Sequence, residues 1–73
     1  SMKKPKKTVE DMLCELETAV AMKDLRKADK TMDRLGAHYV QHDSDNMDIV
    51  NMLDEFYNGG APIEYIVRKY VRR

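Results

Sequence analysis

The chain has 73 residues, of which 36% are charged and 42% hydrophobic, and its 13 basic and 13 acidic residues give a net charge of zero. One cysteine excludes an internal disulfide, and the absence of a run of about 18 apolar residues excludes a membrane-spanning segment. We expect a single cytoplasmic domain with no export signal, and because a core this small usually needs support, we expect a partner chain.

The neutral total conceals blocks of alternating charge. Residues 1–7 carry four lysines, residues 8–22 carry four acids and no base, and residues 43–55 carry five acids and no base. Such blocks can attract one another within a fold, or give one face a charge that the whole molecule lacks. We expect residues 1–7 to form a disordered basic tail and residues 8–73 to form a single helical domain.

The first predicted helix begins at Thr8, which can cap it, with Asp11 three positions later as a weaker form of the capping box. One side of this helix is apolar and faces the core. The other side carries a strip of small, weakly polar side chains among the acids: Cys14, Thr18 and Ala21. This strip is either a solvated surface or a close contact with a partner helix.

Asp24 is expected to cap a second helix, whose apolar seam repeats in steps of three and four residues from Leu25 to Tyr39. A seam this short suits an antiparallel hairpin with the first helix. Gly36 lies beside the seam, where we expect either a neighbouring backbone close by or a bend in the helix. The opposite face carries a basic stripe: Lys23, Arg26, Lys27, Lys30 and Arg34.

The stretch from Ile49 to Tyr57 is expected to form a third helix at the centre of the domain. Its apolar side chains fill an arc of about 160° on a helical wheel, whereas a helix packed on one neighbour needs only about 100°. Those side chains are Ile49, Val50, Met52, Leu53, Phe56 and Tyr57. Ser44 or Asp45 can cap the start of this helix, and residues 58–60 provide left-handed residues for its end.

A fourth helix is expected to start at Pro62, which suits the first helical position. Its outward face carries one aromatic and three basic side chains: Tyr65, Arg68, Lys69 and Arg72. The third helix, the glycine turn and this basic helix have the outline of a helix-turn-helix. We therefore predict an all-α fold, a small four-helix domain in which the antiparallel hairpin of helices 1 and 2 is closed by helices 3 and 4.

The sequence contains no catalytic constellation, so we do not expect an enzyme or a cofactor. His38 and His42 lie one helical turn apart and could share a metal, but a structural zinc site normally needs four protein ligands, so we predict no metal site. Acidic neighbours of Cys14 favour its thiol over the thiolate, which argues against a nucleophile.

The expected function is that of a small cytoplasmic regulatory or adaptor protein that acts by stoichiometric binding to a protein partner. A homodimer is one form that this binding can take, and association with a membrane is not expected. The predicted contact residues lie on the first two helices: Cys14, Thr18, Ala21, Arg26, Lys30 and Arg34. The alternative is a nucleic-acid-binding protein that uses the basic tail and the outward face of the fourth helix: Tyr65, Arg68, Lys69 and Arg72.

Overall fold

The computed structural model describes residues 7–72, and this part of the chain contains helices but no strand. The helices are α1 (Val9–Ala21), α2 (Leu25–His42), α3 (Met47–Tyr57) and α4 (Ile63–Ile66), and a π-helical segment, η1 (Val67–Val71), continues α4. The predicted all-α class is therefore confirmed. The predicted disordered tail, residues 1–7, lies outside the described residues except for Lys7.

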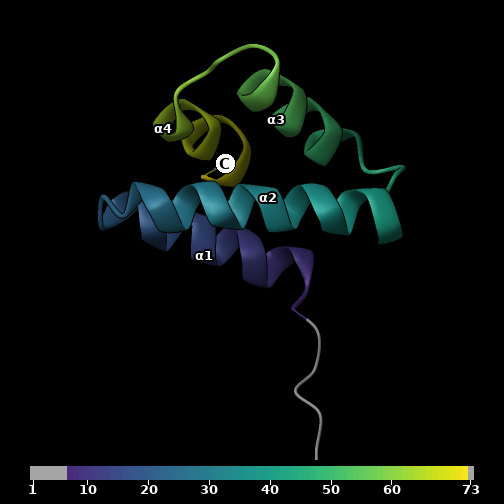
Figure 1. Ribbon diagram of the computed structural model, residues 1–73, viewed down its shortest axis with the longest axis horizontal. Coiled ribbons are helices and arrows are strands. Elements are labelled where there is room, and N and C mark those ends of the chain that lie inside the picture. Colours follow the sequence, from purple (N-terminus) through teal and green to yellow (C-terminus); the bar gives the residue numbers. More distant parts are fainter. Residues whose placement is uncertain (1–6, 73) are drawn as a thin grey trace, which may run out of the picture.

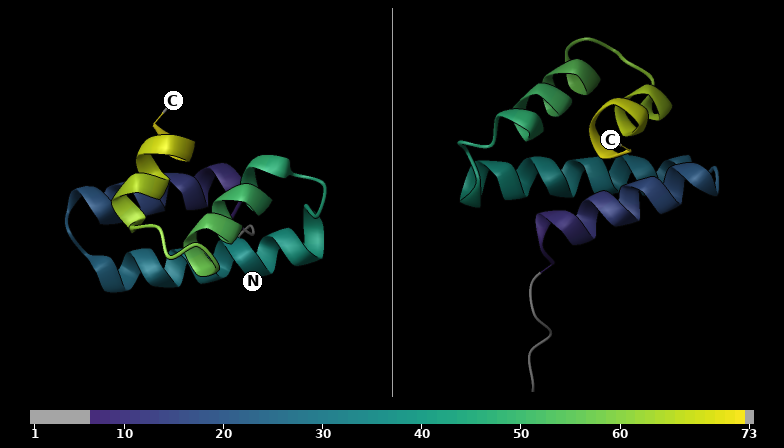
Figure 2. Two further views of the ribbon diagram at one scale, coloured as in Figure 1. Left: turned by 90° about the horizontal axis from the view of Figure 1, so that it is seen from above. Right: turned by 180° about the vertical axis from the view of Figure 1, so that it is seen from behind.

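The helices form two layers (Figures 1 and 2). In the first layer, α1 and α2 lie side by side and run in opposite directions, and in the second, α3 and α4 lie on one side of that pair. Helices from both layers meet in one hydrophobic core. Its largest fully buried apolar side chains are Leu16, Met32, Leu35, Met52, Ile66 and Val67.

The starts of α1 and α2 follow local capping rules. The Thr8 hydroxyl accepts a hydrogen bond from Asp11 N, and the Asp11 carboxylate accepts one from Thr8 N, both at 3.1 Å. Asp24 accepts a hydrogen bond from Lys27 N at 3.1 Å. Both predicted caps are confirmed, because each depends only on residues within one turn of the helix start.

The start of α3 differs from the prediction. Neither Ser44 nor Asp45 caps this helix. Instead, Asn46 Oδ1 accepts a hydrogen bond from Ile49 N at 3.2 Å, and Asn46 Nδ2 donates to the Asp43 carboxylate at 2.9 Å. The amide of Asn46 can do both because it carries a donor and an acceptor, whereas a carboxylate could accept only.

The turn after α3 uses one left-handed residue, Gly60, with a φ of 68°. Pro62 is the residue before α4, which therefore begins one residue later than predicted. The fourth helix also does not continue as a regular α-helix, because Arg72 N donates to Val67 O, five residues back, at 2.9 Å. This wider turn keeps Val67 buried while Val71 packs against the core.

The predicted central position of α3 is wrong. α3 packs against α2 and α4 and is joined to η1 through Glu55, whereas α1 and α2 form the base of the core. Ile49 and Met52 are buried, but Leu53 is only partly buried and Tyr57 is 51% exposed. Its broad apolar arc is therefore only half covered. The buried seam of α2 also begins later than predicted, at Ala28, since Leu25 is 50% exposed.

Candidate functional site

An open groove with a volume of about 280 Å³ lies between α2 and α3. Most of the side chains that line it are apolar. They come from one turn of α2 and from two turns of α3 with the residue that follows: Gly36, Tyr39, Val40, Val50, Leu53, Asp54, Tyr57 and Asn58. Small-molecule sites usually measure about 300–1,000 Å³ and enclose their ligand, so this groove is better suited to one or two side chains of a partner.

The apolar walls of the groove are open to solvent. Val40 projects from α2 and is 74% exposed, and Tyr57 stands across the groove at the end of α3. Val50 and Leu53 continue the α3 wall and are only partly buried. Apolar side chains that gather around a depression, rather than scatter singly over a surface, are typical of a contact site.

Gly36 forms part of the groove where α2 approaches α3. A Cβ atom at this position would meet Leu53 Cδ2 at 3.8 Å, which is an ordinary van der Waals distance. The nearest neighbour is therefore a side chain rather than the predicted backbone, and α2 continues through Gly36 without a break. The missing Cβ keeps this part of the groove deep.

The edges of the groove carry carboxylates. The Tyr57 hydroxyl donates a hydrogen bond to Asp33 Oδ1, and Asn58 Nδ2 donates to Asp54 Oδ1 at 2.7 Å. Partial burial and the hydrogen bond to Asp33 raise the pKa of Tyr57, with a further contribution from the charge of Asp29. The phenol therefore stays protonated, and negative charge borders the apolar walls.

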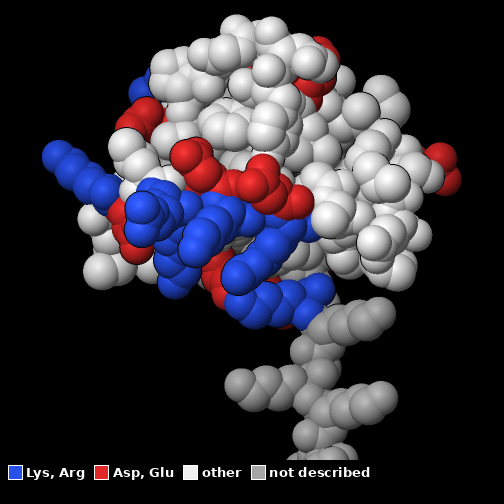
Figure 3. Space-filling view, in the orientation of Figure 1, with Lys and Arg blue, Asp and Glu red and all other residues white. Residues whose placement is uncertain are grey.

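The predicted basic stripe forms one exposed face of α2. Figure 3 shows a band of Lys and Arg over this helix, with Asp and Glu side chains along the edge nearer α3 and α4. Arg26 and Lys30 have no ion pair within residues 7–72, whereas Arg34 Nη1 lies 3.9 Å from Glu15 Oε2. Lys7 also donates to Glu15, and these cations hold the pKa of Glu15 below its ordinary value. The structure thus brings Arg26, Lys30 and Arg34 together at spacings of one turn.

The predicted strip on α1 is exposed along its whole length. Cys14, Thr18 and Ala21 all face away from the core, and none of them lines the groove. No side chain within the described residues forms a hydrogen bond with Cys14 or Thr18. The strip is therefore a separate surface from the groove.

The predicted nucleic-acid-binding residues of the fourth helix are partly engaged within the fold. Lys69 Nζ lies 2.9 Å from Glu55 Oε1 and 5.6 Å from the centre of the Tyr65 ring. Arg72 Nε lies 3.7 Å from a carboxylate oxygen of α1. Arg68 is exposed and has no ion pair within residues 7–72. These side chains therefore do not form a row of unpaired cations.

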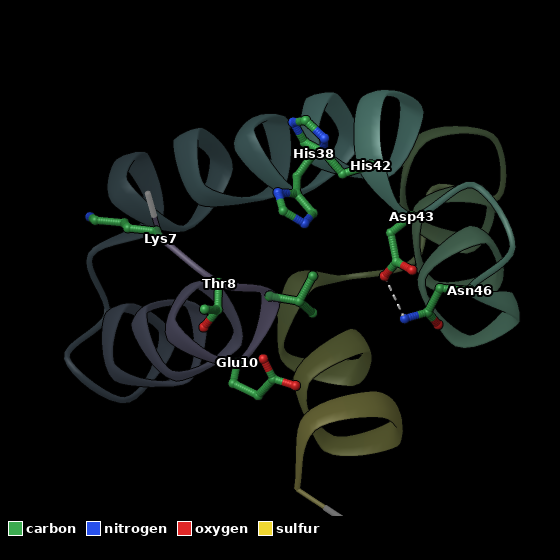
Figure 4. Close-up of a pocket in the computed structure, with 8 residues that line it drawn as sticks. Lys7, Thr8, Glu10, His38, His42, Asp43 and Asn46 are labelled. Atoms are coloured by element: carbon green, nitrogen blue, oxygen red, sulfur yellow. Dashed lines mark hydrogen bonds between the residues drawn. The ribbon is translucent and has the colours of Figure 1, made fainter. Parts of the chain in front are cut away.

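A second hollow, of about 490 Å³, lies where the start of α1 meets the end of α2 (Figure 4). His38 and His42 lie side by side on α2, with ring centres 5.2 Å apart, and Lys7 extends away from them. Asp43 is occupied by its hydrogen bond with Asn46. No group of three or more His, Cys, Asp or Glu side chains within residues 7–72 is arranged to hold a metal ion.

Sequence reasoning missed the residues that matter most for the groove, Val40 and Asp33. Val40 lies on the polar side of α2, outside the apolar seam, and Asp33 is one of several acids. One signal was present in the sequence. The apolar arc of α3 is wider than a single neighbour needs, and Val40 of α2 is an apolar residue outside the seam. Together they indicate an apolar surface that extends across both helices.

Comparison with known proteins gives no relative, since no protein-family model, no curated protein and no solved structure matches this chain. None of the helices in the described part of the chain has both the length and the apolar composition needed to cross a membrane.

Proposed function

We propose that this chain is a small cytoplasmic regulatory or adaptor protein that acts by stoichiometric binding to another protein. The groove between α2 and α3 carries this proposal, because it leaves Val40 and Tyr57 exposed beside the partly buried wall of α3. An antiparallel hairpin of α1 and α2, closed by α3 and α4, is the scaffold on which the groove is built. No catalytic step is part of the proposal.

Binding would combine an apolar anchor with electrostatic selection. An apolar side chain of the partner that covers the groove gains roughly 25 cal/mol for each Å² of apolar surface removed from water. The basic face of α2, with Arg26, Lys30 and Arg34, would steer an acidic region of the same partner, and such charges act mainly on association rate and specificity. The exposed strip with Cys14 on α1 offers a second contact, either to that partner or to another copy of this chain.

A matched pair of variants tests the proposal. Val40→Asn places a polar side chain at the groove, while Gln41→Asn places the same residue one position away, on a surface that does not line it. We expect affinity capture from cell extract to retain a protein on the wild type and on Gln41→Asn, and to lose it on Val40→Asn. If every retained protein binds all three forms equally, the groove is not the binding surface.

Nucleic-acid binding is a second candidate function, favoured by one observation. Arg26 and Lys30 have no ion pair within residues 7–72 and project from one face of α2 with Arg34. Three cations spaced one turn apart can contact phosphates. The nucleic-acid-binding surface of this second candidate therefore lies on α2 rather than on the fourth helix. A gel-shift series should then show affinity that falls steeply with salt and is lost in Arg26→Glu/Lys30→Glu but kept in Arg68→Glu. The absence of any shift at low salt would exclude this function.

A further inference from the structure

The charges around the groove are of one sign. Asp54 lines its α3 side, and Asp33, bonded to Tyr57, stands at its α2 side, with Asp29 one turn further along. No Lys or Arg is among the residues that line the groove. In Figure 3 the band of Lys and Arg over α2 is bordered by Asp and Glu side chains on the edge nearer α3 and α4. A ligand in the groove therefore meets apolar walls and negative edges.

The dimensions of the groove indicate the shape of its ligand. Its α3 wall extends from Val50 to Tyr57, which corresponds to about 10 Å along the helix axis. Two side chains at positions i and i+4 of a helix are about 6 Å apart along that axis, so both fit within this length. A volume of about 280 Å³ also limits the inserted groups to a small number of side chains.

Resting on the proposed function, we infer that the groove is the docking site for a short amphipathic helix of a partner protein, with two apolar side chains one turn apart flanked by Lys or Arg. The apolar pair enters between α2 and α3. The flanking cations meet Asp33 and Asp54 at the two edges. This arrangement joins burial of apolar surface to charge complementarity, which helix-in-groove recognition commonly combines.

Two other occupants fit the groove less well. The exposed face of α1 in a second copy is flanked by Glu10 and Glu17, which would place like charges against Asp33 and Asp54. The lysine-rich segment of residues 1–6 has the right charge, but Met2 is its one apolar side chain of any length, so it lacks a second anchor. Either occupant would compete with an added peptide. Peptide binding would then weaken as the protein concentration rises, for a second copy, or strengthen when residues 1–6 are removed.

The test uses fluorescence anisotropy with three designed helical peptides of about 15 residues, the length at which an isolated helix becomes marginally stable. The first peptide has two leucines four residues apart, flanked by Lys and Arg. The second replaces its Lys and Arg by Glu, and the third replaces both leucines by Ala. We expect the first peptide to bind the full chain at least tenfold more tightly than either of the others.

Variants of the protein locate the binding. Asp33→Asn/Asp54→Asn should weaken the basic peptide about three- to tenfold and reduce the salt dependence of its affinity, while circular dichroism shows an unchanged fold. Val40→Asn should weaken binding of the basic peptide at least as much, and Gln41→Asn should leave that binding unchanged. Equal affinity of the basic and acidic peptides would overturn the inferred partner chemistry. The proposed function would still be supported if Val40→Asn no longer captured a protein from cell extract. Failure of the inferred basic helix and failure of the proposed function are therefore distinguishable.

Discussion

At the scale of single residues, Gly36 links stability to the groove. Glycine within a helix lowers stability by roughly 0.5–1 kcal/mol relative to alanine. At this position a Cβ atom would meet only Leu53 Cδ2, at 3.8 Å, and no backbone atom. The fold therefore does not require glycine here, but the added methyl group would fill part of the surface between α2 and α3.

We predict that Gly36→Ala raises the free energy of unfolding by about 0.5–1 kcal/mol, measured by urea denaturation. The same variant should weaken binding of the basic peptide, because it makes the groove shallower. Ala37→Gly is the matched control. Ala37 is the next residue and is exposed, so this change should lower stability by a similar amount and leave binding unchanged. A less stable Gly36→Ala would mean that α2 and α3 are too close to accept the methyl group.

At the scale of helices, local rules predicted two of the three side-chain caps. Thr8 and Asp24 are the only strong cap residues near the starts of α1 and α2, so the sequence alone identifies them. Before α3 the four residues 43–46 can all act as caps. Which one does so depends on where packing against α2 and α4 fixes the first turn, and that information is not local.

The same limit applies to α3 and to the end of the chain. The apolar arc of Ile49–Tyr57 predicts how wide the contact surface is, but it does not predict whether a helix of the same chain covers it. Ile49 and Met52 of this arc are buried in the core, whereas Val50, Leu53 and Tyr57 line the groove. The π-helical turn of η1 was also not predicted, because its hydrogen bond from Arg72 N to Val67 O has no signature in residues 67–72.

The turn between α1 and α2 contains the one described non-glycine residue with a positive φ, Lys23, at 59°. Lys23 N donates to Val20 O at 3.0 Å and Asp24 N donates to Ala19 O at 2.8 Å, which is the hydrogen-bond pattern of a Schellman motif. Glycine usually occupies this position, because any other residue places its Cβ too close to the following carbonyl oxygen. The turn therefore holds Lys23 in a conformation that costs free energy.

We predict that Lys23→Gly raises the free energy of unfolding by about 0.5–1 kcal/mol, since relief of this strain exceeds the extra entropy that glycine gives the unfolded chain. Thermal unfolding followed by circular dichroism measures the effect. Met22→Gly is the control: Met22 has a φ of −87° and is exposed, so glycine there should lower stability. A loss of stability in Lys23→Gly would show that the lysine side chain contributes more than its backbone conformation costs.

At the scale of the whole molecule, the alternating charge blocks of the sequence correspond to the ion pairs of the fold. Every ion pair within residues 7–72 joins an acid from residues 8–22 or 43–55 to a base from residues 1–7, 23–34 or 62–73. Two pairs share Glu15 of α1, a third joins η1 to α3, and a fourth joins the residue after η1 to α1: Lys7–Glu15, Arg34–Glu15, Lys69–Glu55 and Arg72–Glu17. Most of these side chains are about half exposed, so each pair contributes little alone. Their pattern nevertheless favours this arrangement of helices over one that places like blocks together.

Glu55 is the centre of the contact between α3 and η1. Its carboxylate accepts hydrogen bonds from the Tyr70 hydroxyl and from Lys69 Nζ, and these donors lower the pKa of Glu55 below its ordinary value of 4.5. In the unfolded chain these donors are lost. Between the pKa of Glu55 in the folded chain and its higher pKa in the unfolded chain, the unfolded chain therefore binds more protons. The stability that Glu55 contributes is present at neutral pH and is lost as the pH falls through the pKa of the folded chain.

We predict that Glu55→Gln lowers the midpoint of thermal unfolding at neutral pH, and that the difference from the wild type narrows as the pH falls below 4.5. The neutral amide can still accept a hydrogen bond from Tyr70, but it cannot pair with the charge of Lys69 or lose a proton. Glu64→Gln is the control, because Glu64 is exposed and has no ion pair within residues 7–72. Its difference from the wild type should stay small and nearly constant with pH. If Glu55→Gln differs from the wild type by the same amount at every pH, the carboxylate does not hold η1 against α3 through its charge.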